Sequence, residues 1–156
     1  MRIIVEGIDR VGKSTLCSML QKELSIPVYK DRSEVKEFCN DDLNTKFTDI
    51  LTLIETMPSG VIFDRMHMTE FVYDFLRGDL FFGYPLVDND LAKLNCTLIL
   101  VLSTDIEESS RQHGSDLSKH ENLFLDLYKK SAIKDKIIVT YSGFENLVNV
   151  LKGRRL

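Results

Sequence analysis

The chain has 156 residues, 44% of them hydrophobic and 28% charged, and 24 acidic residues against 20 Lys and Arg give a formal net charge of -4. This length and apolar content suit one buried core, so we expect a single domain over residues 1–156 and exclude both a two-domain enzyme and a disordered chain. Proteins that bind duplex DNA through many phosphate contacts are usually basic, and this chain is acidic. Any phosphate must therefore be bound locally, by a few aimed groups.

The cysteines and the apolar runs indicate where in the cell the protein is expected. The chain has three cysteines, Cys17, Cys39 and Cys96, and this odd number argues against a disulfide framework. Their spacing is not that of a metal site. The first residues are too short and too soon polar for a signal peptide, and no apolar run approaches the roughly 18 residues that span a bilayer. We expect a soluble cytoplasmic protein with no membrane contact.

Short apolar runs alternate along the chain with segments whose apolar residues recur at helical spacing. The expected strands are residues 3–5, 26–29, 61–64, 97–102 and 137–139. The expected helices carry apolar stripes over residues 16–24, 43–54, 68–76, 87–94, 124–128 and 144–151. The alternation predicts a three-layer α/β fold with a five-stranded parallel sheet in the order 2-3-1-4-5.

Two segments between the expected helices and strands are predicted to be loops. Residues 79–90 contain Phe81, Phe82 and Pro85 and are predicted to form a loop that holds aromatic side chains. Residues 104–119 are polar and contain Gly114, which predicts a loop or a mobile lid.

The most informative segment, residues 7–15, follows the first strand and precedes the first helix. It fits the pattern G-x-x-x-x-G-K-[ST] of a P-loop through Gly7, Gly12, Lys13, Ser14 and Thr15. Glycines let backbone N–H groups turn toward a phosphate, and the following helix adds its positive N-terminal end. The lysine supplies a charge for the β- and γ-phosphates and the serine a hydroxyl for Mg²⁺. The segment predicts ATP and Mg²⁺ as ligands.

A second acid supports a metal site. Residues 61–64 form an apolar strand that ends in Asp64, where a P-loop protein places a carboxylate near Mg²⁺. An aspartate that merely caps the next segment would look the same. Beside the P-loop, the metal interpretation is favoured, with Ser14 and Asp64 as ligands.

The P-loop itself carries a charged pair, Asp9 and Arg10. An arginine at this place lies within reach of a transferring phosphoryl group and would act as an arginine finger, although a surface arginine paired with Asp9 gives the same sequence. The chain lacks the Asn-Lys-x-Asp motif that recognises guanine, which argues against a GTPase switch.

Two motifs resemble the thymidylate kinase group of the nucleoside and nucleoside-monophosphate kinases. Residues 6–15, EGIDRVGKST, look like that family's E-G-[IVL]-D-x-x-G-K-S-T, and Asp64 and Arg65, followed by Thr69 and Tyr73, look like its D-R-[YH]-x-x-S-x-x-A-[YF]. The resemblance implies that Asp9 approaches the sugar hydroxyls or the acceptor phosphate and that Arg65 holds the acceptor.

For the remaining arginines, the resemblance implies that Arg10 bridges the donor and acceptor phosphates and that Arg111 belongs to the lid. It also suggests a homodimer. The chain is shorter than most members, like the compact kinases of bacteriophages, and residues 47–55 lack an arginine that the family has. Arg32 only partly replaces the family's T-R-E-P. The preceding Asp31 is, like Asp9, a candidate partner of an acceptor hydroxyl, although a plain loop residue gives the same sequence.

Other side chains have two interpretations each. A nucleobase needs a stacking ring, for which Phe47, Phe71, Tyr73 and residues 81–84 are candidates, although most aromatics at helical spacing belong to a core. His67 and His120 are expected at the surface, and His113 stands near Arg111 in the predicted lid.

These residues predict ATP- and Mg²⁺-dependent phosphoryl transfer to a deoxynucleoside monophosphate, with Lys13, Arg10, Asp64 and Arg111 as catalytic residues. One alternative keeps the chemistry but transfers to a hydroxyl, on a nucleoside or on a hydroxymethylated pyrimidine within DNA, because a neutral acceptor needs fewer cations. A second alternative is a nucleotide-binding module without catalysis.

Overall fold

The computed structural model describes residues 1–30, 43–57, 59–79, 81 and 83–155. Its centre is a parallel sheet of five strands in the order β2-β3-β1-β4-β5, which confirms the predicted fold class and strand order. The strands are β1 (Arg2–Glu6), β2 (Val28–Lys30), β3 (Val61–Asp64), β4 (Thr97–Val101) and β5 (Asp135–Val139).

The central strands owe their place to their composition. All of β3 and β4 is buried, and so is β1 after Arg2. Continuous apolar runs of this kind suit a parallel sheet that is covered on both faces. The register pairs Ile3 with Ile62 on one side and with Thr97 on the other, so the carboxyl ends of β1, β3 and β4 lie together.

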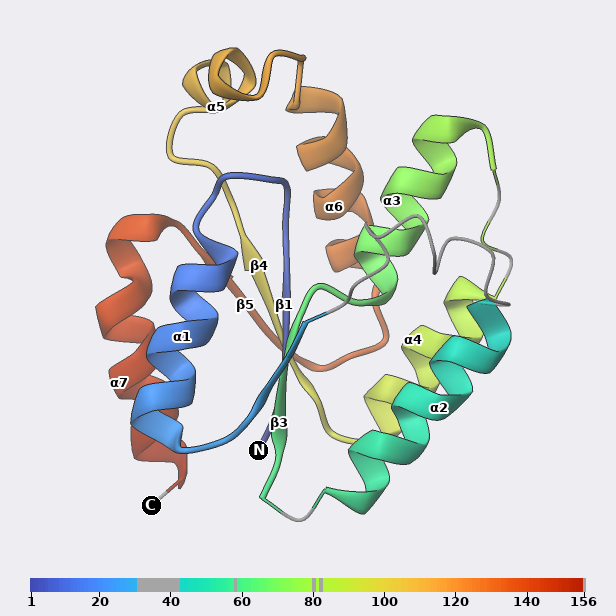
Figure 1. Cartoon of the computed structure of the whole chain (residues 1–156), viewed down its shortest axis with the longest axis vertical. Helices are drawn as coiled ribbons and strands as arrows, with labels where there is room; N and C mark the ends of the chain where they lie inside the picture. Colours follow the sequence, from blue (N-terminus) through green and yellow to red (C-terminus); the bar gives the residue numbers. More distant parts are fainter. Residues whose placement is uncertain (31–42, 58, 80, 82, 156) are drawn as a thin grey trace.

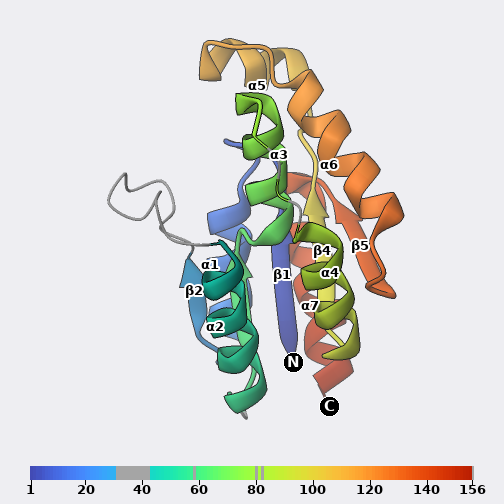
Figure 2. The ribbon, with the colours of Figure 1, turned by 90° about the vertical axis from the view of Figure 1, so that its right-hand side faces the viewer.

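Helices cover both faces of the sheet (Figure 1). One face carries α1 (Lys13–Leu24) and α7 (Phe144–Arg155), and the other carries α2 (Leu43–Thr56), α3 (His67–Arg77), α4 (Tyr84–Lys93) and α6 (Ser118–Lys130). A short 3-10 helix, η2 (Tyr141–Gly143), precedes α7. Figure 2 shows β2 and β5 at the two edges and α5 (Ile106–His113) across the carboxyl end of the sheet.

Two predicted loops contain helix instead. Residues 106–113 form α5, with the Asp105 carboxylate accepting hydrogen bonds from the N–H groups of Glu107 and Glu108, each at 3.0 Å, and with Gly114 in the left-handed region at the other end. Apolar periodicity gave no signal because none of its residues is buried. Likewise, α4 begins at Tyr84, inside the predicted aromatic loop, because Tyr84 and Val87 pack into the core.

The remaining expectations concern cysteines and membranes. Cys17 and Cys96 are buried free thiols, and burial raises the pKa of both, to about 11 for Cys96. Cys39 lies outside the described residues. Among the described helices, none has the length and apolar content to cross a bilayer.

Candidate active site

The loop between β1 and α1 is shaped by two glycines with positive φ. Gly7 has a φ of 144°, and a Cβ atom there would lie 2.4 Å from the carbonyl oxygen of Val101 at the end of β4. Gly12 has a φ of 92°, and a Cβ atom there would lie 3.0 Å from the ring of Tyr141. A larger residue would strain the backbone at both positions, would collide with the backbone of Val101 at position 7, and would crowd the Tyr141 ring at position 12. The pattern glycines are therefore required by the fold of the loop.

Lys13 begins α1 and is buried, with only 5% of its surface exposed. Its Nζ donates a hydrogen bond to the carbonyl oxygen of Ile8, across the loop. Burial lowers the pKa of Lys13 to about 8, helped by the nearby Arg65 guanidinium and opposed by the carboxylates of Asp9 and Asp64. The ammonium is thus held in a poorly solvated place where an anionic ligand would stabilise its charge.

Ser14 and Asp64 meet as the metal interpretation requires. The Ser14 hydroxyl donates to Asp64 Oδ2 at 2.8 Å, which joins the start of α1 to the end of β3. Asp64 is 2% exposed, and its buried Oδ1 atom has no hydrogen-bond partner among the residues that the structure describes. A buried carboxylate oxygen without a partner fits a cation ligand.

This donor set suits Mg²⁺ rather than a metal held by protein alone. Within the described part of the chain, no group of three or more His, Cys, Asp or Glu side chains gathers around one point. Mg²⁺ keeps several waters and takes few protein ligands when phosphates complete its shell. Ser14 and Asp64 would hold the ion, with the remaining ligands supplied by nucleotide and water.

Asp9 is the centre of a second cluster beside Lys13. Its Oδ1 accepts a hydrogen bond from Arg65 Nη2 at 2.7 Å, and its Oδ2 accepts one from the Tyr73 hydroxyl at 3.1 Å. Asp9 and Arg65 remain partly exposed, at 27% and 18% of their side-chain surfaces. The structure therefore brings together three residues that the sequence predicted to bind substrate, from the P-loop, the end of β3 and α3.

Arg10, also in the P-loop, is exposed and has a φ of 62°, in the left-handed region. Among the described residues Arg10 forms no ion pair, and the Asp9 carboxylate pairs with Arg65 instead, which leaves the Arg10 side chain available to a ligand. Its predicted catalytic role remains a prediction.

Glu6 is a component that sequence reasoning named only as part of a motif. It ends β1, is 0% exposed, and accepts hydrogen bonds through Oε1 from the N–H groups of Met66 and Met68, both at 3.0 Å. Its Oε2 accepts from the Thr69 hydroxyl at 2.5 Å. The side chain thereby caps the N-terminus of α3, whose own N-cap residue supplies no side-chain bond.

This cap fixes the segment that carries the site. Arg65 has a φ of 74°, and its N–H donates to the carbonyl oxygen of Val5 at 2.9 Å, immediately before the capped helix. Burial raises the pKa of Glu6, against the effect of His67 and of the hydrogen bonds from Thr69 and the backbone. Thr69, predicted to bind substrate, is thus buried at 5% exposure and bonded to Glu6.

His67 is not at the surface, contrary to the sequence prediction. It is 0% exposed, its Nε2 lies 2.9 Å from Asp88 Oδ1, and its ring stacks on Tyr84 with centroids 5.1 Å apart. Asp88 also accepts hydrogen bonds from the Ser131 hydroxyl and the Ala132 N–H. The sequence does not reveal this burial, because the acidic partner Asp88 is distant along the chain.

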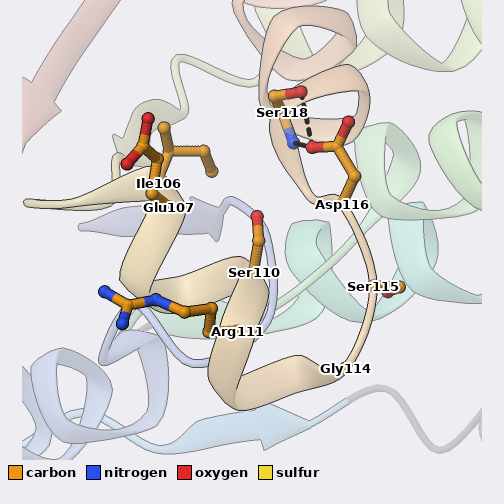
Figure 3. A pocket seen from close by; sticks show the side chains of 8 residues that line it. All are labelled: Ile106, Glu107, Ser110, Arg111, Gly114, Ser115, Asp116 and Ser118. Carbon is orange, nitrogen blue, oxygen red and sulfur yellow. Dashed lines mark hydrogen bonds between the residues drawn. The ribbon is translucent and has the colours of Figure 1, made fainter.

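Arg111 lies on α5 with 73% of its side chain exposed, and its Nη2 lies 2.5 Å from Glu108 on the same helix. It borders a cavity of about 580 Å³ between α5 and the start of α6, shown in Figure 3. Ser110, Ser115 and Asp116 also line this cavity. Among the described residues, the guanidinium pairs with Glu108 on the same helix and forms no ion pair with another part of the candidate site. The catalytic role of Arg111 remains a prediction.

The other candidates divide between core and undescribed segments. Phe47 is 2% exposed and stacks on Phe81 with centroids 5.2 Å apart, and Phe71 packs on Tyr84 at 5.0 Å, as core aromatics do. The predictions for Arg32 and Asp31 fall outside the described residues, as does that for Phe82.

Comparison with known proteins found matches among solved structures. No family model and no curated protein sequence matches the chain. A YorR protein from Bacillus subtilis, solved with phosphorylated GDP, is 18% identical with a TM-score of 0.75, over 99% of this chain and 98% of that one. A deoxyadenosine kinase from M. mycoides, solved with dCMP and a flexible dCDP, is 15% identical with a TM-score of 0.57, over 99% and 98% of the two chains.

A shikimate kinase from Bacteroides thetaiotaomicron has a TM-score of 0.52 at 13% identity, over 99% of this chain and 97% of that one. The strand order agrees with these folds. The chain has the fold of P-loop kinases. At these identities the likeness concerns the fold, and the chemistry must be argued from the side chains.

Proposed function

We propose that this protein transfers the γ-phosphoryl group of ATP to a deoxynucleoside monophosphate. The P-loop backbone and Lys13 would bind the β- and γ-phosphates, and Ser14 and Asp64 would hold Mg²⁺. Mg²⁺ bound there would neutralise charge on the phosphate oxygens. Arg65, Asp9 and Tyr73 would place the acceptor, and Arg10 would lie between donor and acceptor.

The observation that carries the proposal is the position of Arg65 next to the P-loop lysine. Its guanidinium is close enough to Lys13 to help lower that pKa, although the two residues come from different strand ends. Holding two cations together is unfavourable, and the nearby carboxylates of Asp9 and Asp64 do not restore the ordinary pKa of Lys13, so further negative charge would stabilise the pair. Two phosphates, one from each substrate, would supply that negative charge and meet in line for transfer.

A hydroxyl acceptor is the second candidate, and the Asp9–Arg65 ion pair favours it. Since the N–O distance of 2.7 Å already commits the guanidinium to Asp9, part of the charge available to an acceptor phosphate is neutralised. Deoxyadenosine kinase and shikimate kinase, both similar in fold, are named for acceptors that are not phosphates. A carboxylate at this place would also accept a proton from a reacting hydroxyl.

ATP consumption across a panel of acceptors tests the proposal. The panel holds the four deoxynucleoside monophosphates, free deoxynucleosides, and DNA with plain or hydroxymethylated pyrimidines. We expect turnover with at least one monophosphate and none with the Lys13→Met variant. Transfer only to a nucleoside or DNA hydroxyl would favour the second candidate. Tight ATP binding without transfer to any acceptor would mean a nucleotide-binding module.

A further inference from the structure

The C-terminal end of α5 reaches the acceptor side of the site through His113. The Nε2 atom of His113 lies 3.6 Å from Asp9 Oδ2, and the two side chains are 33% and 27% exposed. The contact joins residues that are far apart in the sequence and that come from α5 and the P-loop. Both atoms are therefore accessible to a ligand while facing one another.

The imidazole is oriented by its other nitrogen. The Nδ1 atom lies 2.7 Å from the Ser115 hydroxyl, just beyond the glycine with a φ of 81° that ends the helix. A ring nitrogen with a fixed partner determines which way the other nitrogen points. Ser115 thus leaves Nε2 as the nitrogen that faces Asp9.

Three described side chains approach the two carboxylate oxygens of Asp9. Arg65 occupies Oδ1 and the Tyr73 hydroxyl approaches Oδ2, while His113 faces Oδ2 from α5. A distance of 3.6 Å is too long for a direct hydrogen bond. It is short enough for one oxygen atom to lie within hydrogen-bond distance of both.

The chemistry of the two atoms selects the group that fits. Asp9 Oδ2 accepts a hydrogen bond, and Nε2–H of the imidazole donates one. A hydroxyl donates and accepts at once, whereas a phosphate oxygen would be repelled by the carboxylate. Arg111, on the same helix, is 73% exposed and paired with Glu108, so His113 is the residue that α5 directs at Asp9.

We propose that His113 is a substrate-binding residue that, together with Asp9, holds a sugar hydroxyl of the acceptor. This inference rests on the proposed function and adds to it a contact from α5. It predicts that the protein distinguishes deoxynucleoside monophosphates from their 2′,3′-dideoxy analogues, and that part of this discrimination comes from His113.

The test combines a side-chain change with a substrate change. The kcat/KM of the wild type, His113→Phe and His113→Gln is measured with the best monophosphate of the panel and with its dideoxy analogue. Loss of one hydrogen bond to the hydroxyl corresponds to roughly a tenfold effect. We expect His113→Phe to lose about tenfold with the monophosphate and little with the analogue, at unchanged KM for ATP.

Two variants serve as controls. His113→Gln keeps a donor and should regain part of the activity with the monophosphate only. Gln112→Ala removes a neighbouring exposed side chain of α5 that bonds to Glu108 and should change neither rate. Melting temperatures of all variants should match that of the wild type, because His113 is exposed.

The outcomes separate this inference from the proposed function. Equal losses of His113→Phe with both substrates, or no loss with either, would overturn the role of His113 while the kinase activity stands. A wild type that phosphorylates no monophosphate would overturn the proposed function, and the inference with it.

Discussion

The proposed donor and acceptor sides of the candidate site are built in different ways. The donor side consists of one continuous loop, residues 7–15, and needs only Asp64 from elsewhere. The acceptor side takes Asp9 from that loop, Arg65 from the end of β3, Tyr73 from α3 and His113 from α5. The first is a local device and the second a product of packing. Changes on the donor side should therefore stop the chemistry, whereas changes on the acceptor side should alter which substrate is used.

The largest effect is expected at the P-loop lysine. Lys13→Met should lower kcat by about a thousandfold, because it removes the buried charge that faces the transferring group. Because burial lowers the pKa of Lys13 in the folded protein, the charged lysine makes the folded state less stable at neutral pH. The free energy of unfolding of the variant, measured in urea, should therefore be about 1–3 kcal/mol higher than that of the wild type. Undiminished turnover in this variant would remove the basis of the kinase proposal.

The next largest effect is expected at Asp64, the proposed metal ligand. Asp64→Asn should lower kcat by about a hundredfold and raise the Mg²⁺ concentration at half-maximal rate, because one charged oxygen is replaced by an amide. Ser14→Thr keeps the hydroxyl and should behave like the wild type in the same Mg²⁺ titration. An unchanged titration of Asp64→Asn would show that this aspartate only caps the strand end.

On the acceptor side, Arg65→Gln should raise the KM for the acceptor by about thirtyfold while changing the KM for ATP little. The guanidinium is the described cation nearest to Asp9, at 2.7 Å. Initial rates over a matrix of both substrate concentrations give the two constants. Should the two KM values rise together, Arg65 would belong to the donor side as well.

Glu6 connects the two sides, since it ends β1 and caps α3. Glu6→Gln keeps the shape and an accepting oxygen, and we expect about a tenfold loss in kcat/KM for the acceptor in a stably folded protein. Glu6→Ala leaves the buried N–H groups of Met66 and Met68 without their partner and should also lower the free energy of unfolding by about 3 kcal/mol. Chemical denaturation and acceptor kinetics are measured on both variants. Full activity in Glu6→Ala would limit Glu6 to stability.

The smallest effect is expected at Arg111. Because its guanidinium is exposed and pairs with Glu108, Arg111→Gln should change kcat by no more than about threefold and leave stability unaltered. Steady-state kinetics at saturating ATP and acceptor give the number. A loss beyond tenfold would mean that the arginine turns into the site during turnover, as the sequence resemblance implies.

The sequence predicted the strand order and the donor side because their signals are local. Continuous apolar runs predict β1, β3 and β4, which are buried in the structure, and the glycine spacing predicts the P-loop. The same approach missed α5, whose signals were a capping aspartate and a glycine rather than an apolar stripe. It also placed His67 at the surface, since its partner Asp88 lies on another helix.

By itself, then, the sequence determined that a glycine-rich loop would follow the first strand and that a carboxylate would end the strand at residues 61–64, since residues 7–15 and Asp64 follow from short-range patterns. Only the tertiary structure decided what surrounds Asp9 and which residue of α5 reaches it. Contacts between residues such as Asp9 and His113 depend on how separate elements pack, and spacing along the chain carries no record of that packing.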